Sequence, residues 1–267
     1  MKVLSIQDIA CYGQCSNTVA LPILSHFGIE TAILPSAILS THTAGFAGYT
    51  NLDLTDEMEK IVNHWEKEGI RFDAIYTGYI GNARQFPLIL RIKKNLLKPN
   101  GLFIVDPAMA DHGKLYPALD EDIVDGMRSL VQEADLIFPN ITEACLLAGG
   151  EYQNEQDEES NSLLIQKLIL LGAKKIVLTS VQYDEKIGAM VYDGGDVETI
   201  LKEKDPCNYH GSGDIFASVA IGKYLSTGDL LKATDTACAF ILEAIHLTKK
   251  DEQHRYGLHF EALLKNL

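Results

Sequence analysis

The sequence predicts an α/β fold with a mainly parallel central sheet, helices on both faces and no large lid. Two observations support this prediction. Short β-branched runs alternate with longer helical stretches along all 267 residues, and polar residues follow the ends of five predicted strands. Strands that alternate with helices form βαβ units with a parallel sheet. Because no internal repeat or linker is visible, we expect one domain over residues 1–267.

The first half of the chain is expected to hold four strands and four helices. The strands are the apolar runs Val3–Gln7, Thr31–Leu34, Ala74–Thr77 and Leu102–Val105. The helices are Cys15–Phe27, Thr55–Glu68, Asn82–Leu97 and Glu121–Glu133. Ser16 or Asn17 lies near the first helix start, and Thr55 is predicted as the N-cap of the second. Helix stops are expected at Gly28, Gly69 and Pro99-Asn100-Gly101.

The second half continues the alternation and then adds a hairpin and helices. Strands are expected at Leu136–Phe138 and Lys175–Thr179, with helices at Thr142–Ala148 and Leu163–Leu171. The acidic stretch Glu151–Ser160 is predicted to be a solvated loop. Gly188–Val191 and Val197–Leu201 are expected to pair as a hairpin. Three helices complete the chain, over Gly211–Leu225, Leu230–Ile245 and Phe260–Leu264.

The polar residues at the strand ends indicate where a ligand binds. Open parallel sheets bind ligands at the carboxyl ends of their strands. The polar segments there are Gln7-Asp8, Thr77-Gly78-Tyr79, Asp106-Pro107, Pro139-Asn140 and Thr179-Ser180. We therefore expect these five segments to converge on one edge of the sheet and form a site.

The overall charge restricts the class of partner. The formal net charge is −14 and the sequence pI is about 4.9. No basic stripe is present to pair with a nucleic acid backbone, and an anionic membrane surface would repel the chain. An anionic small-molecule substrate would have to be held locally by backbone amides, a few cations and a bound metal.

Cysteine usage indicates a reducing compartment. The five cysteines form no CxxC pair and match no zinc spacing; they are Cys11, Cys15, Cys145, Cys207 and Cys238. We expect reduced thiols and a cytoplasmic location. The apolar run at the N-terminus is too short for a signal peptide, and no run approaches the length of a membrane span.

The most informative segment is His210-Gly211-Ser212-Gly213-Asp214, which opens a predicted helix of small and apolar residues. Unpaired N–H groups at a positively polarised helix end suit an anion such as phosphate. A carboxylate beside them can take a proton from a hydroxyl that attacks the phosphate. On these residues alone, a tight turn with a capping aspartate is an equal alternative. A dinucleotide fingerprint is absent because Phe216 stands at its third glycine position, and neither Gly-Lys pair continues as a Walker loop.

Other segments have both a structural and a functional interpretation. Asn140 and Glu143 form good helix-start chemistry, and Glu143 could also orient water around Mg²⁺. Asp106 and Asp111 could close turns or face a metal–phosphate. Thr179 and Ser180 could end a strand or donate hydroxyls to phosphate oxygens. His42 could contact a polar ring, although an exposed histidine is the commoner outcome.

Taken together and in this order, these segments resemble the ribokinase-like superfamily of small-molecule kinases, and within it the pyridoxal/pyridoxamine kinases. The resemblance covers nearly the whole chain. Its motifs are Ser5–Asp8 with Tyr12-Gly13 and Ser16-Asn17, Ser40–Thr43, Gly78–Gly81, Asp106–Asp111 with Gly113–Tyr116, Pro139–Glu143, Thr179-Ser180 and Gly211–Asp214. The resemblance implies an ATP-dependent kinase that phosphorylates the 5′-hydroxymethyl group of a B6 vitamer.

The same resemblance implies a role for each motif residue. Asp214 would be the base that activates the substrate alcohol, and the amides of Gly211, Ser212 and Gly213 would stabilise the phosphoryl group in transfer. Thr43 and Tyr79 would line the pyridine pocket. The residues implied for Mg-ATP are Asp111, Asn140, Thr179, Ser180 and Glu143, the last acting on the metal through water. A homodimer and, by analogy alone, activation by K⁺ or another monovalent cation are also implied.

Asp8 departs from the family pattern, because pyridoxal kinases commonly carry serine there. We hypothesise that Asp8 still contacts the ring and favours a protonated ring nitrogen or the amine of pyridoxamine. The departure keeps hydroxymethylpyrimidine kinase open as an alternative, together with a non-catalytic B6-binding homologue. A sugar kinase is disfavoured because Leu34–Ser40 leaves no room for a lid of strands, and an oxidoreductase lacks its fingerprint.

Overall fold

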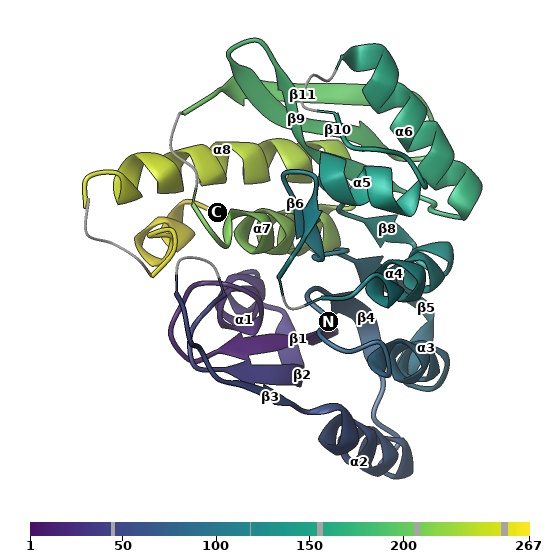
Figure 1. Ribbon diagram of the computed structural model, residues 1–267. Coiled ribbons are helices and arrows are strands. Elements are labelled where there is room, and N and C mark those ends of the chain that lie inside the picture. Colours follow the sequence, from purple (N-terminus) through teal and green to yellow (C-terminus); the bar gives the residue numbers. More distant parts are fainter. Residues whose placement is uncertain (44–45, 118, 154–156, 206–208, 252–255) are drawn as a thin grey trace.

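The computed structural model describes residues 1–43, 46–117, 119–153, 157–205, 209–251 and 256–267. Across these residues one sheet has the strand order β11-β10-β9-β8-β5-β4-β1-β2-β3 (Figure 1). Its strands are β1 Lys2–Ala10, β2 Glu30–Leu39, β3 Asn51–Asp53, β4 Phe72–Thr77, β5 Leu97–Val105, β8 Leu136–Ile137, β9 Ile176–Tyr183, β10 Lys186–Tyr192 and β11 Val197–Glu203. The six strands from β9 to β2 pair in parallel, and β3, β10 and β11 pair antiparallel at the edges.

Helices cover both faces of this sheet, as the alternation of strands and helices predicted (Figure 1). They are α1 Asn17–His26, α2 Thr55–Lys67, α3 Gln85–Leu96, α4 Asp122–Gln132, α5 Ile141–Leu147, α6 Glu158–Leu171, α7 Ser212–Thr227 and α8 Leu230–Thr248, followed by the 3₁₀ helix η1 Glu261–Asn266. Alternate residues of a strand point to opposite faces. Accordingly Ile75 packs in the core under α2 to α6, whereas Ala74 and Tyr76 pack under α1, α7 and α8.

Several predicted boundaries are wrong, each for a local reason. Thr55 is the first residue of α2 and Leu54 is its N-cap; the Thr55 N–H instead bonds Asp53. Helix α6 begins at Glu158, inside the predicted loop, because Asp157 and Ser160 form a capping box. Residues 97–101 belong to β5 and not to a helix end, since Leu97 pairs with Phe72 of β4.

The strand ends near the predicted site also differ from expectation. β9 does not end at Thr179-Ser180, because its antiparallel pairing with β10 continues to Tyr183. On the other edge of β9, the parallel pairing ends at Thr179, which forms an isolated bridge with Asn140. The short strands β6 Ala110–Asp111 and β7 Lys114–Leu115 form a hairpin that the sequence did not predict, and β3 was also missed. Two-residue and three-residue strands have too few positions for an alternating pattern to be visible.

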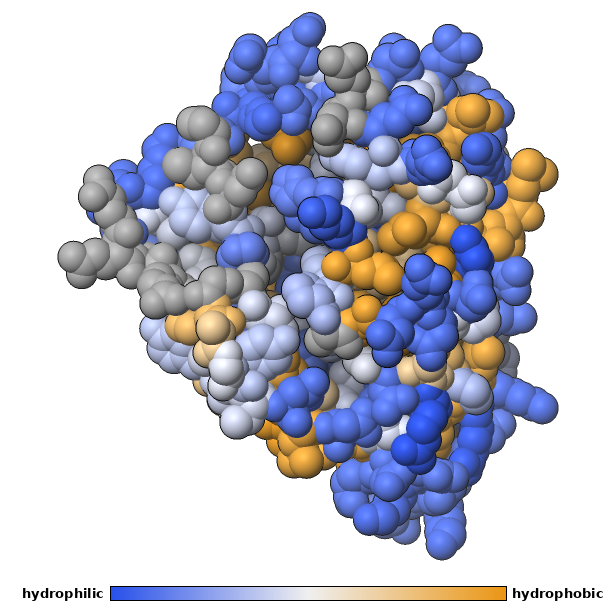
Figure 2. Space-filling model, in the orientation of Figure 1, coloured by the Kyte–Doolittle hydropathy of each residue, from blue (hydrophilic) through white to orange (hydrophobic). Residues whose placement is uncertain are grey.

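In the described part of the chain, no helix is both long enough and apolar enough to cross a membrane. The face drawn in Figure 2 is largely hydrophilic, with hydrophobic groups gathered over the region of α4 and α5.

Candidate active site

The carboxyl ends of the parallel strands meet along one edge of the sheet, as predicted. Hydrogen bonds tie the residues after each strand to the neighbouring strand. The Gly78 N–H donates to the Ile6 carbonyl at 3.1 Å, and the Asp106 N–H to the Thr77 carbonyl at 2.8 Å. The Thr179 N–H donates to the Pro139 carbonyl at 2.8 Å. This ladder brings the five polar segments into one row. Gln7 and Asp8 do not follow the end of β1 as predicted, because the pairing of β1 with β2 continues to Ala10; only its pairing with β4 stops at Ile6.

Helix α7 begins at this row, held there by its first glycine. Gly211 has a φ of 79°, a conformation that favours glycine, and a Cβ on it would lie 2.0 Å from the Gln14 carbonyl oxygen. The start of α7 is therefore packed directly against the loop that follows β1. Gly213, in contrast, is exposed, and a Cβ on it would meet no atom within 4 Å. Gly213 is thus accessible in the first turn of α7, and the unpaired N–H groups of a helix N-terminus suit an anion.

Two carboxylates from distant parts of the chain meet at Ser16. Ser16 lies near both carboxylates: its hydroxyl lowers the pKa of Asp8, and its backbone N–H lowers the pKa of Asp214, each opposing the effect of burial. Burial raises the pKa of Asp8 to about 6. Burial, with a further contribution from the negative charge of Asp8, raises the pKa of Asp214 to about 7. Asp214 therefore sits at the pKa range suited to a general base near neutral pH.

Two buried carboxyl groups, Asp106 and Glu143, belong to the same row, and the charge of Asp214 acts on the first of them. Asp106, directly after β5, is buried, and its pKa is raised by burial and by the charges of Glu143 and Asp214. Burial raises the pKa of Glu143 to about 8, although three backbone N–H groups oppose this shift. The Tyr116 phenol lies near these carboxyl groups. Burial is the main cause of its raised pKa, and the charges of Glu143 and Asp214 add to the shift.

Asn140 and Glu143 build the start of α5 and hold the neighbouring loop. They form a reciprocal capping box, as the structural interpretation of their spacing expected. Glu143 also accepts from the Met109 N–H at 3.1 Å, and the Asn140 amide donates to the Ala110 carbonyl at 2.8 Å. The segment after β5 is thereby fixed to α5. A role of Glu143 toward a metal through water stays a proposal.

The other predicted nucleotide residues lie at the outer part of the row. Asp111 is exposed and accepts the His112 N–H, yet its charge still acts on Glu143. The Thr179 hydroxyl donates to the Pro139 carbonyl at 3.3 Å. Ser180 is exposed and has a φ of 61°, which turns the backbone at the point where the parallel pairing ends.

Of the other predicted substrate residues, Tyr79 lies near Asp8, and Thr43 follows a histidine that contacts the loop after β1. The pKa of the Tyr79 phenol is raised by burial and by the charge of Asp8, so the two side chains are neighbours. Thr43 is partly buried and follows His42, whose N–H bonds the Tyr12 carbonyl. His42 packs edge to face on Phe46 at 4.8 Å and lies 5.9 Å from the ring of His210. Thr43 therefore directly follows a residue, His42, whose ring lies near His210, just before α7.

Sequence reasoning missed three residues that the structure brings into the site. Asp106 was considered with Asp111 as a turn residue or a group facing a metal–phosphate but was given no role in the site; its place directly after a buried strand is the signal for it. Tyr116 directly follows the hairpin of β6 and β7, which the sequence did not predict. Ser16 was interpreted as a helix start only, and its contact with two aspartates depends on the fold.

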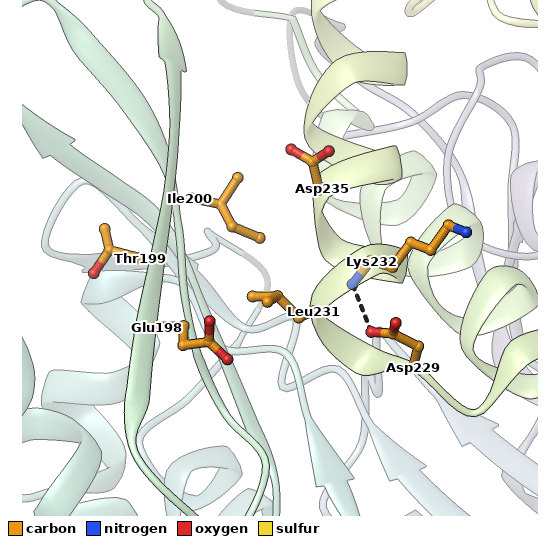
Figure 3. A pocket seen from close by; sticks show the side chains of 7 residues that line it. All are labelled: Glu198, Thr199, Ile200, Asp229, Leu231, Lys232 and Asp235. Carbon is orange, nitrogen blue, oxygen red and sulfur yellow. Dashed lines mark hydrogen bonds between the residues drawn. The ribbon is translucent and has the colours of Figure 1, made fainter.

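A separate hollow of about 530 Å³ lies between β11 and the start of α8 (Figure 3). Ile200 and Leu231 line it together with polar side chains, and the Lys232 N–H bonds Asp229 at its rim. None of the predicted site residues lines this hollow, so it is not part of the candidate active site.

Comparison with known proteins agrees with this geometry. The family described as phosphomethylpyrimidine kinase matches residues 24–258. A Bacteroides thetaiotaomicron protein, whose crystal structure was solved in a form with pyridoxal, has 36% sequence identity to this chain. The two structures superpose with a TM-score of 0.94, and the match covers 99% of this chain and 94% of that chain. Pyridoxal kinase from Lactobacillus plantarum is 31% identical, with a TM-score of 0.90, covering 99% and 95%. Dictyostelium discoideum pyridoxal kinase is 29% identical over 239 residues, 83% of this chain and 77% of that protein.

Proposed function

The chain belongs to the phosphomethylpyrimidine kinase family, and from that premise we propose that it is a kinase that transfers the γ-phosphoryl group of ATP to the 5′-hydroxymethyl group of a B6 vitamer. One observation carries the proposal. The Asp214 carboxylate, with a pKa of about 7, stands in the first turn of α7 beside the open space at Gly213. A base and an anion cradle at one helix end are the two elements that phosphoryl transfer to an alcohol requires.

The reaction follows from these positions. The substrate hydroxyl gives its proton to Asp214, and its oxygen forms a bond to the γ-phosphorus. The bond from that phosphorus to the β–γ bridging oxygen breaks, and ADP leaves. The N–H groups of Ser212 and Gly213 stabilise the charge on the phosphoryl oxygens during transfer, because they lie at the positive end of a helix of 16 residues.

Asp8, Tyr79 and Thr43 are assigned to the ring of the vitamer, and the outer part of the row to the nucleotide. In the described residues, no cluster of three or more His, Cys, Asp or Glu is arranged to hold an ion alone. Mg²⁺ would therefore take most of its ligands from phosphate and water, with Asp111 and, through water, Glu143 as the protein groups. When bound, Mg²⁺ neutralises phosphate charge. A monovalent activating cation, a homodimer and a cytoplasmic location belong to the same proposal.

The decisive experiment compares candidate substrates with the purified protein and Mg-ATP. ADP release is measured with pyridoxal, pyridoxamine, pyridoxine and hydroxymethylpyrimidine in parallel. Turnover of at least one B6 vitamer well above hydroxymethylpyrimidine supports the proposal. A preference for hydroxymethylpyrimidine would replace it with the thiamine-precursor kinase that the family description favours, and ADP release with none of them would leave a B6-binding homologue.

Replacement of Asp214 tests the assignment of the base. Asp214→Asn should lower kcat by about 10²–10⁴-fold, the usual contribution of a positioned base, while ATP binding persists. Asp135→Asn is the matched control, because Asp135 bonds Phe103 and Lys174 at the start of β8, at the opposite edge of the sheet. Activity of Asp214→Asn within threefold of the wild type would mean that another group takes the proton.

A further inference from the structure

The C-terminal segment of the chain holds the loop that follows β1. The Gln14 N–H donates to the Tyr256 carbonyl at 2.8 Å, and the Gln14 side-chain amide donates to the carboxylate of Glu261 in η1. Gly257, which has a φ of 138°, packs so closely on Gln14 that a Cβ on it would lie 2.8 Å from the Gln14 Cβ. Gln14 is 4% exposed. The loop and the segment therefore meet at one buried residue.

The same residue packs against the start of α7. The Gln14 carbonyl oxygen lies directly against the backbone of Gly211, where any side chain would collide with it. Gly211 is the N-cap of α7, and Asp214 stands in the first turn of this helix. Gln14 thus touches both the C-terminal segment and the helix to which the base and the anion cradle are assigned.

The C-terminal segment is itself anchored in the core. Leu258 and Phe260 are buried among the residues that pack under α1, α7 and α8. Between them, the His259 N–H donates at 2.8 Å to the hydroxyl of Thr248, the last residue of α8. The loop after β1 is therefore tied to a fixed point of the fold.

We propose that Gln14 is a positioning residue, which transfers the position of the C-terminal segment to the start of α7 and so places Asp214 and the first N–H groups of that helix. The inference rests on the proposed function and extends it to a residue that is assigned to neither substrate. A hydrogen bond to a charged acceptor such as Glu261 is worth about 10- to 100-fold in an equilibrium. A misplacement of reacting groups by about 1 Å lowers a rate by about 10²-fold.

A charge swap tests the contact between Gln14 and Glu261. Gln14→Glu places a second carboxylate against Glu261, and like charges repel. We expect kcat to fall by about 10- to 100-fold, with the KM for the vitamer within about threefold of the wild type, because Gln14 packs on the helix and is not assigned to the vitamer. Adding Glu261→Gln to Gln14→Glu restores a hydrogen-bonded pair and should return kcat to within about threefold of the wild type. Unchanged kcat in Gln14→Glu, or no recovery in the swapped pair, would overturn the proposal.

The same 3₁₀ helix offers a matched control. The Asn266 amide donates to the carboxylate of Glu243 in α8 at 3.5 Å. Asn266→Asp therefore sets two carboxylates against each other in η1 and leaves Gln14 untouched, so it should keep the kcat of the wild type. A loss as large as that of Gln14→Glu would show that any disturbance of η1 lowers kcat, and it would overturn the role assigned to Gln14.

Two further measurements keep the test decisive. If Gln14→Glu does not fold, Glu261→Ala removes the acceptor from an exposed position: a lowered kcat supports the proposal, and an unchanged kcat overturns it. ATP binding, measured by isothermal titration calorimetry, should weaken in Gln14→Glu and recover in the swapped pair, because the N–H groups at the helix start move with Gln14. If the wild type turns over no vitamer while ATP binding follows this pattern, the proposed function fails and the positioning by Gln14 stands.

Discussion

Ser16 shows how one residue can organise a site at the scale of single contacts. Its φ of 51° and ψ of −131° are unusual for a residue with a side chain, and the residue is buried. Backbone strain of this kind costs of the order of 1–3 kcal/mol and persists only where the surroundings fix it. Here the strained residue lies near two carboxylates, and it lowers the pKa of both Asp8 and Asp214. We infer that the strain is retained because it keeps Ser16 beside these two groups.

A pair of substitutions at residue 16 separates strain from hydrogen bonding. Ser16→Ala and Ser16→Gly both remove the hydroxyl, but only glycine adopts the backbone conformation without strain. We expect Ser16→Gly to be more stable than Ser16→Ala by about 1 kcal/mol in urea unfolding. Equal stability of the two variants would show that the backbone of residue 16 is not strained in solution.

At the scale of elements, the start of α7 depends on two glycines with different tasks. Gly211 has a backbone conformation that favours glycine and packs against Gln14, so it positions the helix. Gly213 lies within α7 without a positive φ and faces open space. Its importance is therefore expected in ligand approach and not in folding.

The two glycines give opposite results when replaced by alanine. Gly211→Ala should lower the midpoint of thermal unfolding, because its Cβ would collide with a backbone oxygen that cannot move easily. Gly213→Ala should change this midpoint no more than an ordinary surface substitution does. It should weaken the binding of ATP, which is measured by isothermal titration calorimetry. Normal ATP affinity in Gly213→Ala would place the phosphate elsewhere.

At the scale of the whole molecule, the charges of the site oppose those of the surface. At the row, the buried carboxyl groups of Asp8 and Glu143 and the partly buried carboxyl group of Asp214 have a raised pKa. Paired or hydrogen-bonded carboxylates outside it have a lowered pKa: for Asp157 backbone hydrogen bonds to Ser160 are the main cause, and for Asp73 the hydrogen bond from Lys98. The molecule thus gains stability from its surface carboxylates and loses some at the site. Such a loss at a functional site is a common consequence of preparing groups for catalysis.

This contrast predicts the pH dependence of stability. A carboxyl group whose pKa is raised binds more protons in the folded state than in the unfolded state between its two pKa values. The free energy of unfolding of the free protein should therefore fall as pH rises from about 4 to 8, the window set by Asp8, Asp214 and Glu143. Below about pH 4 it should fall again as groups such as Asp73 are protonated. Urea unfolding between pH 3 and 9 measures the free energy of unfolding across both pH ranges. In Asp214→Asn, the fall of this free energy between about pH 4 and 8 should be smaller.

The sequence by itself determined the parallel sheet, its row of polar strand ends and the glycine-rich start of α7. These features depend on local patterns: β-branched runs, helix caps and residues that directly follow a strand. Only the tertiary structure decided that Asp106 is a buried acid on which the charge of Asp214 acts, that Ser16 lies near both Asp8 and Asp214, and that Gly211 positions α7. The reason is that burial and charge coupling arise between residues far apart in the chain, and no local pattern records which of them will meet.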